Sequence, residues 1–359
     1  DIDVDETNAV TLTNITAANG SITVDAGGAI TVTSVVSSTD ADANDISLTT
    51  TSGDITVNTI TAGSVGDVNL TSAAAINDDG SAGTVITADV LTATAVGAMT
   101  LDTTVNSIDL TTSAAGNIDV DETNAVTLTN ITAADGSITV DAGAAITVTS
   151  VVSSTDADAN DISLTTTSGD ITVNTINAGS VGDVNLTSAA AINDDGSAGT
   201  VITADVLTAT AAGAMTLDTS VNSVDLTTSA AGNIDVDETN AVTLTSITAA
   251  DGSITVDAGG AIGVTSVVSS TDADTNDISL TTTVGDITIS TVTAGNVGDV
   301  NLTSAAAIND DGSTGTVITA DVLTATAAGA ITLDTTVNSI DLTTSAAGNI
   351  DVDETNAVT

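Results

Sequence analysis

Residues 21–35 read "SITVDAGGAITVTSV", two short strand patterns on either side of a turn. Ile22 and Val24 alternate with Thr and Asp, and Ile30 and Val32 flank a Thr in the same way. Alternation of apolar and polar residues is typical of a β-strand with one buried face. Gly adopts positive φ without strain and Asp tolerates turn conformations, so "DAGG" favours a turn. The stretch therefore predicts strand, turn and strand within fifteen residues.

The same words recur at 137–151 and 253–267, as part of a longer repeat. "IDVDETNAVT" starts at residues 2, 118, 234 and 350, which is a period of 116. The first two copies differ at seven of 116 positions, which indicates recent duplication and predicts a longer parent array. We expect one continuous solenoid made of 1–116, 117–232 and 233–348, followed by 349–359 as the start of a fourth unit.

Strand words also follow one another inside each unit, as in "DISL" at 45–48, "DITV" at 54–57 and "DVNL" at 67–70. No window shows helical apolar spacing with helix caps around it. Recurrence every 18 to 24 residues predicts an all-β fold, a parallel β-helix or β-solenoid, with five or six coils per unit. The first predicted coils cover 22–45, 46–67 and 68–89.

An array of Ig-like β-sandwiches is the alternative, because such domains have about 100 residues. Ig-like cores normally contain aromatic residues, and this chain has none. The words also repeat within the unit, whereas sandwich strands usually differ from one another. These two facts favour the solenoid.

The composition excludes much chemistry. The 359 residues include no Lys, Arg, His, Cys, Pro or aromatic residue, and the formal charge is −48. Such charge often indicates disorder, but Ile, Val and Leu make up 29 of the first 116 residues, above the roughly 20% at which disorder is expected. Zinc sites, thiol or imidazole catalysis and nucleic-acid binding are all disfavoured. No apolar run reaches the roughly 18 residues of a membrane span.

The words "GSITV" at 20–24, "GDITV" at 53–57 and "GNIDV" at 116–120 resemble the repeats of filamentous-haemagglutinin-like adhesins and other giant repetitive bacterial surface proteins. The resemblance covers the whole chain and implies a right-handed parallel β-helix, secretion, and a role as a rod or stalk. The chain departs from this family in lacking the amino-terminal secretion domain and any basic residue. These departures leave the export route and charge-based receptor binding open.

Three acidic clusters are candidate metal sites, since calcium prefers several oxygen ligands. "DIDVDE" is expected to turn its aspartates outward, with the glutamate following at the turn. "TDADAND" begins like an EF-hand loop but has Asp45 in place of the Gly and Thr51 in place of the final Glu. "NDDG" at 77–80 equally fits a plain turn. The candidate ligands are Asp3, Asp5, Glu6, Asp119, Asp121, Glu122, Asp235, Asp237, Glu238, Asp40, Asp42 and Asp45.

A solvated acidic surface is the simpler interpretation of each cluster. Collective binding of divalent cations rests on firmer ground, because no internal cation offsets the 48 carboxylates and self-repulsion opposes folding. Paired carboxylates also occur in glycosidases. Here no aromatic platform exists to stack a sugar, and the acidic words recur in every unit. We therefore expect no enzymatic activity.

Threonine arrays at 11–16, 31–34 and 49–51 are the last candidate. They predict outward T-x-T rows like those of ice-binding solenoids, or simply reflect β-propensity on an exposed face. A flat ice-binding face requires coils of equal length, and the predicted coils are unequal.

The leading expectation is a structural, non-catalytic segment of an extracellular bacterial solenoid, forming a rod, stalk or filament at the cell surface. The alternatives are an adhesin module that binds a surface partner through calcium, and an ice-binding solenoid. Expected partners are divalent cations and further copies joined end to end, because an uncapped solenoid exposes strand edges that can pair with another chain.

Overall fold

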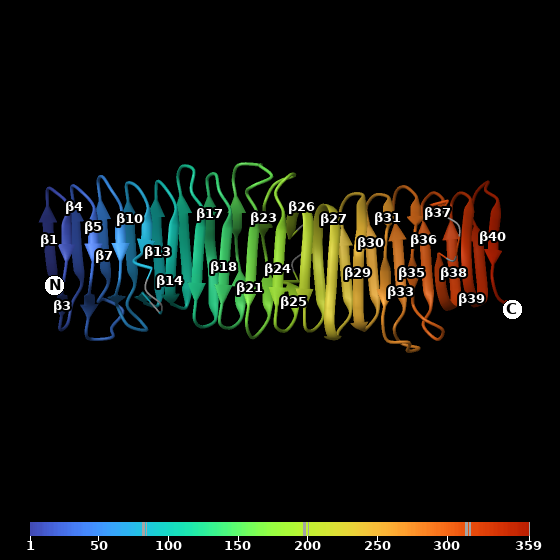
Figure 1. Ribbon diagram of the computed structural model, residues 1–359, viewed down its shortest axis with the longest axis horizontal. Coiled ribbons are helices and arrows are strands. Elements are labelled where there is room, and N and C mark those ends of the chain that lie inside the picture. The colour runs from blue at the N-terminus through green and yellow to red at the C-terminus, as the bar shows by residue number, and fades with distance from the viewer. Residues whose placement is uncertain are drawn as a thin grey trace. The chain divides into compact units, whose positions relative to one another are not determined.

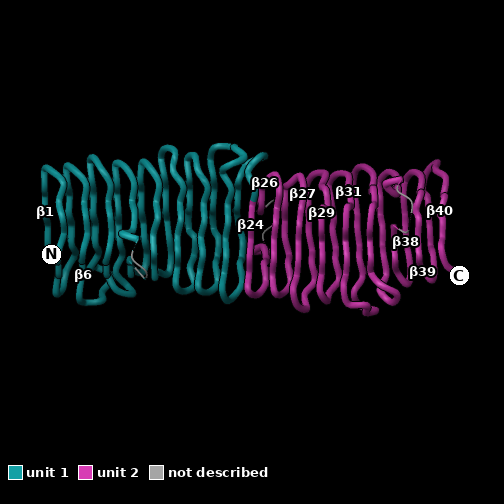
Figure 2. The backbone as a smooth tube through the Cα atoms, in the orientation of Figure 1, with its two compact units in different colours: residues 1–183 teal, residues 184–359 magenta. Residues whose placement is uncertain are grey.

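The computed structural model describes residues 1–80, 83, 85–196, 199, 201–312, 315 and 317–358. They form two compact units, residues 1–183 and 184–359 (Figure 2). Each unit is a parallel β-solenoid, with about 21 residues per coil and no helix among the described residues. The boundary between the units falls inside the second 116-residue repeat, so the units and the sequence repeats are different divisions of the chain.

Short strands joined by turns make up both units, and many are only three to six residues long (Figure 1). The strands of unit 1 are β1 (Ile2–Glu6), β2 (Val10–Leu12), β3 (Ile15–Ala17), β4 (Ile22–Ala26), β5 (Ile30–Val32), β6 (Val35–Ser37), β7 (Ile46–Thr50), β8 (Ile55–Val57), β9 (Ile60–Thr61), β10 (Val68–Ser72), β11 (Ile76–Asp78), β12 (Ile86–Thr87), β13 (Val90–Ala95), β14 (Met99–Thr104), β15 (Ser107–Thr112), β16 (Ile118–Glu122), β17 (Val126–Ala133), β18 (Ile138–Ala142), β19 (Ile146–Val148), β20 (Val151–Ser153), β21 (Ile162–Thr166), β22 (Ile171–Val173) and β23 (Ile176–Asn177). The strands of unit 2 are β24 (Val184–Ser188), β25 (Ile192–Asp194), β26 (Ile202–Ala211), β27 (Met215–Ala231), β28 (Ile234–Glu238), β29 (Val242–Asp251), β30 (Ile254–Ala258), β31 (Ile262–Val264), β32 (Val267–Ser269), β33 (Ile278–Thr282), β34 (Ile287–Ile289), β35 (Val292–Thr293), β36 (Val300–Ser304), β37 (Ile308–Asp310), β38 (Ile318–Ala327), β39 (Ile331–Thr344) and β40 (Ile350–Glu354).

Parallel pairing stacks each aliphatic residue on the equivalent residue of the next coil. In unit 1, Ile22 pairs with Ile46, Ile46 with Val68, and Val68 with Leu91. All four side chains are fully buried. Burial of such a side chain is worth about 1.5–3 kcal/mol. The interior is therefore a set of aliphatic columns, and the intervening Thr, Ser, Asn and Asp face outward.

Three of the predicted coil starts are confirmed, because residues 22, 46 and 68 occupy one column of the sheet. The third coil ends one residue later than predicted, since the next residue in that column is Leu91. The Ig-like alternative is wrong, because every strand pair within each unit is parallel.

Unit 1 has two ladders that form the two sides of each coil, and each coil contributes one or two strands to each ladder. Ladder A passes through Ile2, Ile22, Ile46, Val68, Leu91 and Ile108. Its successive spacings are 20, 24, 22, 23 and 17 residues. Ladder B passes through Val10, Ile30, Ile55, Ile76, Met99 and Ile118. The coil lengths differ because the turns, and not the strands, absorb the extra residues.

The 116-residue repeat is out of phase with the coils. Ile118 is the copy of Ile2, yet Ile2 lies in ladder A and Ile118 in ladder B. Five coils separate Val10 from Ile118, and the passage from Ile2 to Val10 adds about half a coil. One repeat therefore spans about five and a half coils, and successive repeats place the same strand on opposite sides of the coil.

Unit 2 repeats this arrangement. Ile234 lies in a column that runs from Ile192 through Met215 to Ile254 and Ile278, whereas its copy Ile350 pairs with Ile331 in the other ladder. A register shift lies between Ile108 and Asp109 where β15 pairs with β17, and another between Val224 and Asp225 in unit 2. At each shift one residue of the later strand, Thr129 in β17 and Thr245 in β29, has no residue opposite it in the earlier strand.

Candidate functional site

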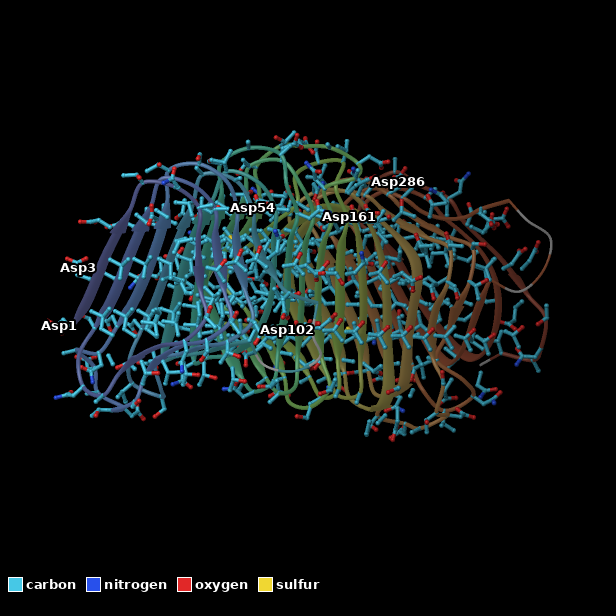
Figure 3. The ribbon with its side chains drawn as sticks, turned by 60° about the vertical axis from the view of Figure 1, so that its left-hand side comes forward. Asp1, Asp3, Asp54, Asp102, Asp161 and Asp286 are labelled. Carbon is cyan, nitrogen blue, oxygen red and sulfur yellow. The ribbon has the colours of Figure 1, made fainter. Side chains whose placement is uncertain are left out.

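Outward aspartates form a row at the junction between the first two repeats. Asp102 pairs with Asp121, and Asp121 with Asp141, so three carboxylates occupy consecutive coils at the strand spacing of about 4.8 Å. Asp102 is half-buried and the other two are exposed (Figure 3 labels Asp102). Unit 2 has the equivalent row of Asp218, Asp237 and Asp257.

The carboxylates in and beside this row repel one another. Burial raises the pKa of Asp102, and the neighbouring carboxylates of Asp78, Asp121 and Asp119 raise it further. Burial and the same kind of like-charge repulsion raise the pKa of Asp119. Like charges placed directly opposite one another destabilise a sheet. A cation bound along the row therefore offsets the repulsion between these carboxylates.

Surface grooves lie along outward aspartates of neighbouring coils in both units. In unit 1 one groove is lined by Asp5, Asp25, Gly27, Thr49 and Thr51, and it belongs to ladder A. Its copy in ladder B is lined by Asp121, Asp141, Gly143, Thr165 and Thr167. Unit 2 has a third groove along Asp218, Asp237 and Asp257. The half-coil offset thus places two copies of one groove on opposite sides of unit 1.

Two glutamates of the "DIDVDE" copies line the same grooves as these aspartates but are largely buried. Glu122 and Glu238 are each the last residue of a strand, next to the turn, and each is only 3% exposed. We expected their position at the turn but not this burial. The alternation of side chains along "IDVDE" does indicate this burial, because the fifth residue lies on the same side of the strand as the Ile and the Val.

Glu122 binds donors from two repeats. Its Oε2 accepts hydrogen bonds from Thr103 Oγ1 at 2.8 Å and from the Val105 amide at 3.1 Å. Its Oε1 accepts one from the Asn124 amide at 3.1 Å. Burial raises the pKa of Glu122, and these hydrogen bonds offset part of that effect. Glu238 makes the same contacts with Thr219, Val221 and Asn240. We call Glu122 and Glu238 the junction glutamates.

Glu6, the first copy, has a different environment. It is half-exposed, and its Oε1 accepts hydrogen bonds from the backbone amide and the side-chain amide of Asn8. Those bonds lower the pKa of Glu6. Asp3 and Asp5 are exposed beside it on β1, as expected. The copies of this five-residue word thus have two kinds of surroundings, because Glu122 and Glu238 are buried against the preceding coil and Glu6 is half-exposed.

The "TDADAND" cluster is divided among separate contacts. Asp40 Oδ1 accepts hydrogen bonds from the Ser64 and Val65 amides at 2.8 and 2.9 Å, and Asp40 Oδ2 accepts one from Ser64 Oγ at 2.6 Å. These bonds lower its pKa. Asp45 accepts from the Asp67 amide at 3.1 Å. Asp42 is exposed. The carboxylates of this cluster therefore hold turns of adjacent coils together.

The "NDDG" cluster forms a turn, in which Asp78 Oδ1 accepts a hydrogen bond from the Gly80 amide at 2.6 Å. Asp79 accepts a hydrogen bond from Asn58 of the preceding coil. Across the part of the chain that the structure describes, no three acidic residues gather closely enough to hold one metal ion. The oxygen-only donor set suits hard cations such as calcium. Its arrangement in open rows fits ions spread along a surface better than one closed site.

Threonines form a second surface feature on ladder A. Thr49, Thr71, Thr94, Thr111 and Thr132 occupy one outward column over consecutive coils. The register is kept although the coils differ in length. The adjacent column is mixed, with Ser47, Asn69, Thr92, Asp109 and Asn130, so a true T-x-T pair occurs in only one coil of this stretch.

No family model, curated protein or solved structure matches this chain. Within the described ranges, the chain has no helix that is both long and apolar enough to cross a bilayer. What the structure supports directly is a β-helix repeat region with acidic rows, shallow grooves and a threonine column.

Proposed function

We propose that this chain is a structural, non-catalytic segment of an extracellular, adhesin-like solenoid that serves as a rod, stalk or filament. The observation that carries the proposal is the unbroken parallel stacking within each unit, where aliphatic columns fill the interior. The described side chains supply acidic rows and hydroxyl columns but no His, Cys, Lys or Arg to combine with them. Copies of the chain associate end to end, because a parallel ladder can be extended by the strands of another copy.

The test is electron microscopy of the purified chain, combined with sedimentation over a range of concentrations. We expect elongated particles whose length increases with concentration. Compact particles that stay monomeric at all concentrations contradict both the rod and the association. Elongated particles that remain monomeric contradict the association alone.

A second candidate function is calcium-dependent adhesion, favoured by the acidic rows on both sides of unit 1. Calcium collects along Asp102, Asp121 and Asp141 and bridges the row to an acidic partner surface. Calorimetric titration with calcium tests this against a variant carrying Asp102→Asn, Asp121→Asn and Asp141→Asn. Equal calcium uptake by the two proteins contradicts a role for the row.

The threonine column favours ice binding as a third candidate. Hydroxyls repeating at the strand spacing present a regular face to water. The test is a thermal-hysteresis measurement on the chain and on a variant with Thr71→Lys and Thr94→Lys. Absence of hysteresis in the unmodified chain eliminates this candidate.

A further inference from the structure

One position of the 116-residue repeat carries a different residue type in the first copy than in the next two. It is Asn19 in the first repeat and Asp135 and Asp251 in the next two. Asn19 Oδ1 accepts a hydrogen bond at 3.1 Å from Nδ2 of Asn44, which lies one coil further on. Asp135 accepts the equivalent bond from Asn160 at 2.9 Å. The site thus binds an amide oxygen and a carboxylate oxygen in the same way.

The asparagine donors are fixed in place. Asn44 is 4% exposed, and its Nδ2 also donates to the Thr39 carbonyl at 2.8 Å. Asn276, the copy in the third repeat, donates to Asp251 Oδ1 at 2.8 Å and is equally buried. Because the donor is held by its own loop, the residue at position 19 can change from amide to carboxylate while the contact persists.

The backbone at this position is suited to that change. Asn19–Gly20 is the only Asn-Gly pair in the sequence. Asn19 is exposed, and among the described residues the Gly20 amide has no hydrogen-bond acceptor. Asn69, by contrast, precedes Leu70 inside β10, where parallel ladders lie on both sides. A free amide and a residue without Cβ allow the close approach of the Gly20 nitrogen to Asn19 Cγ.

We propose that Asn19 is a self-modification site at which the amide converts to a carboxylate without an enzyme. The Gly20 nitrogen loses its proton and attacks Asn19 Cγ, and the side-chain nitrogen takes up a proton and leaves as ammonia. The cyclic imide then takes up one water, which opens it at either carbonyl. The balance is one water consumed and one ammonia released, with no oxidant or reductant. The Asn44 N–H stabilises the side-chain oxygen while negative charge develops on it.

The two possible products have different consequences. Opening that restores the normal backbone gives the aspartate found in the other repeats, and Asn44 then donates a charge-assisted hydrogen bond. Opening at the other carbonyl inserts a side-chain carbon into the backbone immediately before β4, where Ile22 pairs with Ile2 and Ile46. The fold therefore accepts the first product and disfavours the second. This inference does not depend on the proposed function.

The experiment follows the folded full chain over days at neutral pH by peptide mass spectrometry. We expect the peptide containing Asn19 to gain the mass of an amide-to-acid exchange several-fold faster than any other Asn peptide. The matched control is Asp135→Asn, which creates a second Asn-Gly pair. There, the Gly136 amide likewise has no hydrogen-bond acceptor among the described residues, and Asn160 donates to residue 135, so we expect conversion at a similar rate.

Two results overturn the proposal. One is an Asn19 peptide that stays unchanged in the folded chain while the same peptide converts in denaturant, because the fold then protects the amide. The other is an Asn19→Asp variant with reduced thermal stability or lost protection of the Asn44 side chain, because the product is then not native-like. Unchanged stability of Asn19→Asp together with rapid conversion at Asn19 supports it.

Discussion

The junction glutamates allow a sharp test of how repeats are joined. Replacing Glu122 by Ala removes a buried carboxylate that accepts three hydrogen bonds. Thr103 can turn its hydroxyl toward the Asp121 carbonyl, 3.4 Å away. The amides of Val105 and Asn124 are then left without that acceptor. We therefore expect Glu122→Ala to destabilise the junction between the first two repeats.

The magnitude follows from the two amides. A buried donor left unsatisfied costs about 1–3 kcal/mol, so the pair costs roughly 2–6 kcal/mol. Removing a desolvated charge returns part of this, because burial of an ion costs several kcal/mol before its hydrogen bonds form. We expect a net loss of about 2–3 kcal/mol at neutral pH. Glu122→Gln keeps one acceptor oxygen and removes the charge, so its loss is about 1 kcal/mol or less.

Hydrogen exchange followed by mass spectrometry is the suitable assay, because repeat proteins open locally and a single melting temperature averages over many coils. A loss of about 2–3 kcal/mol accelerates exchange in residues 99–126 by roughly 30- to 150-fold. Glu6→Ala is the matched control, since Glu6 lies in the same five-residue word but is half-exposed and accepts hydrogen bonds from Asn8 in its own turn. The reasoning is refuted if the two substitutions accelerate exchange equally, or if Glu122→Ala leaves the rate unchanged.

Three further predictions concern charge and close packing. Burial raises the pKa of Glu122, and burial with neighbouring carboxylates raises that of Asp102. A carboxyl whose pKa is raised in the folded state holds its proton more tightly there, so the free energy of unfolding falls as the pH rises through that pKa. The melting temperature should therefore increase as the pH is lowered from 7 toward the ordinary carboxyl pKa of about 4. A steady decrease over this range contradicts the prediction. Added salt or millimolar calcium should raise the melting temperature at pH 7, and identical melts in chelator and calcium contradict the predicted role of cations. Gly143→Ala should be strongly destabilising, because the added Cβ would overlap the Thr123 carbonyl oxygen. Gly196 has φ +74° and open space around it, so Gly196→Ala should cost only about 1 kcal/mol. Equal losses of stability in thermal melts contradict this steric difference.

The coil pattern follows from alternation alone. Ile22, Ile46 and Val68 start consecutive coils because aliphatic residues two apart require a common buried side. The half-coil offset was not predicted, because a period of 116 residues does not show where the turns lie. It becomes visible only in the strand pairing, where five coils and the passage from Ile2 to Val10 separate Ile2 from Ile118.

The candidate sites were predicted less well, for a related reason. Outward aspartates follow from strand parity, and the rows they form depend on which residue of the next coil lies opposite, as with Asp102 and Asp121. Burial of Glu122 was missed because an acidic residue near a turn is normally solvated. Its environment is created by Thr103, which lies directly opposite it in the preceding coil, and by Val105, two residues further along that coil. The surroundings of these acidic residues are therefore set by contacts between coils, which a local sequence pattern does not show.

The half-coil offset also determines which strands stack on one another at the junctions between repeats. "IDVDE" must stack on "MTLDT" of β14 when it lies in ladder B, and it precedes "ITVDA" of the next coil in both ladders. Aliphatic positions match in every case, so either side of the coil accepts the word. The mismatch is confined to the last position, where Glu122 lies between Thr103 and Ala142. A small residue there would leave the Val105 amide unpaired, and a glutamate can reach both it and the threonine. Glu122 and Glu238 thus hold the last position of the word against the preceding coil at these two junctions.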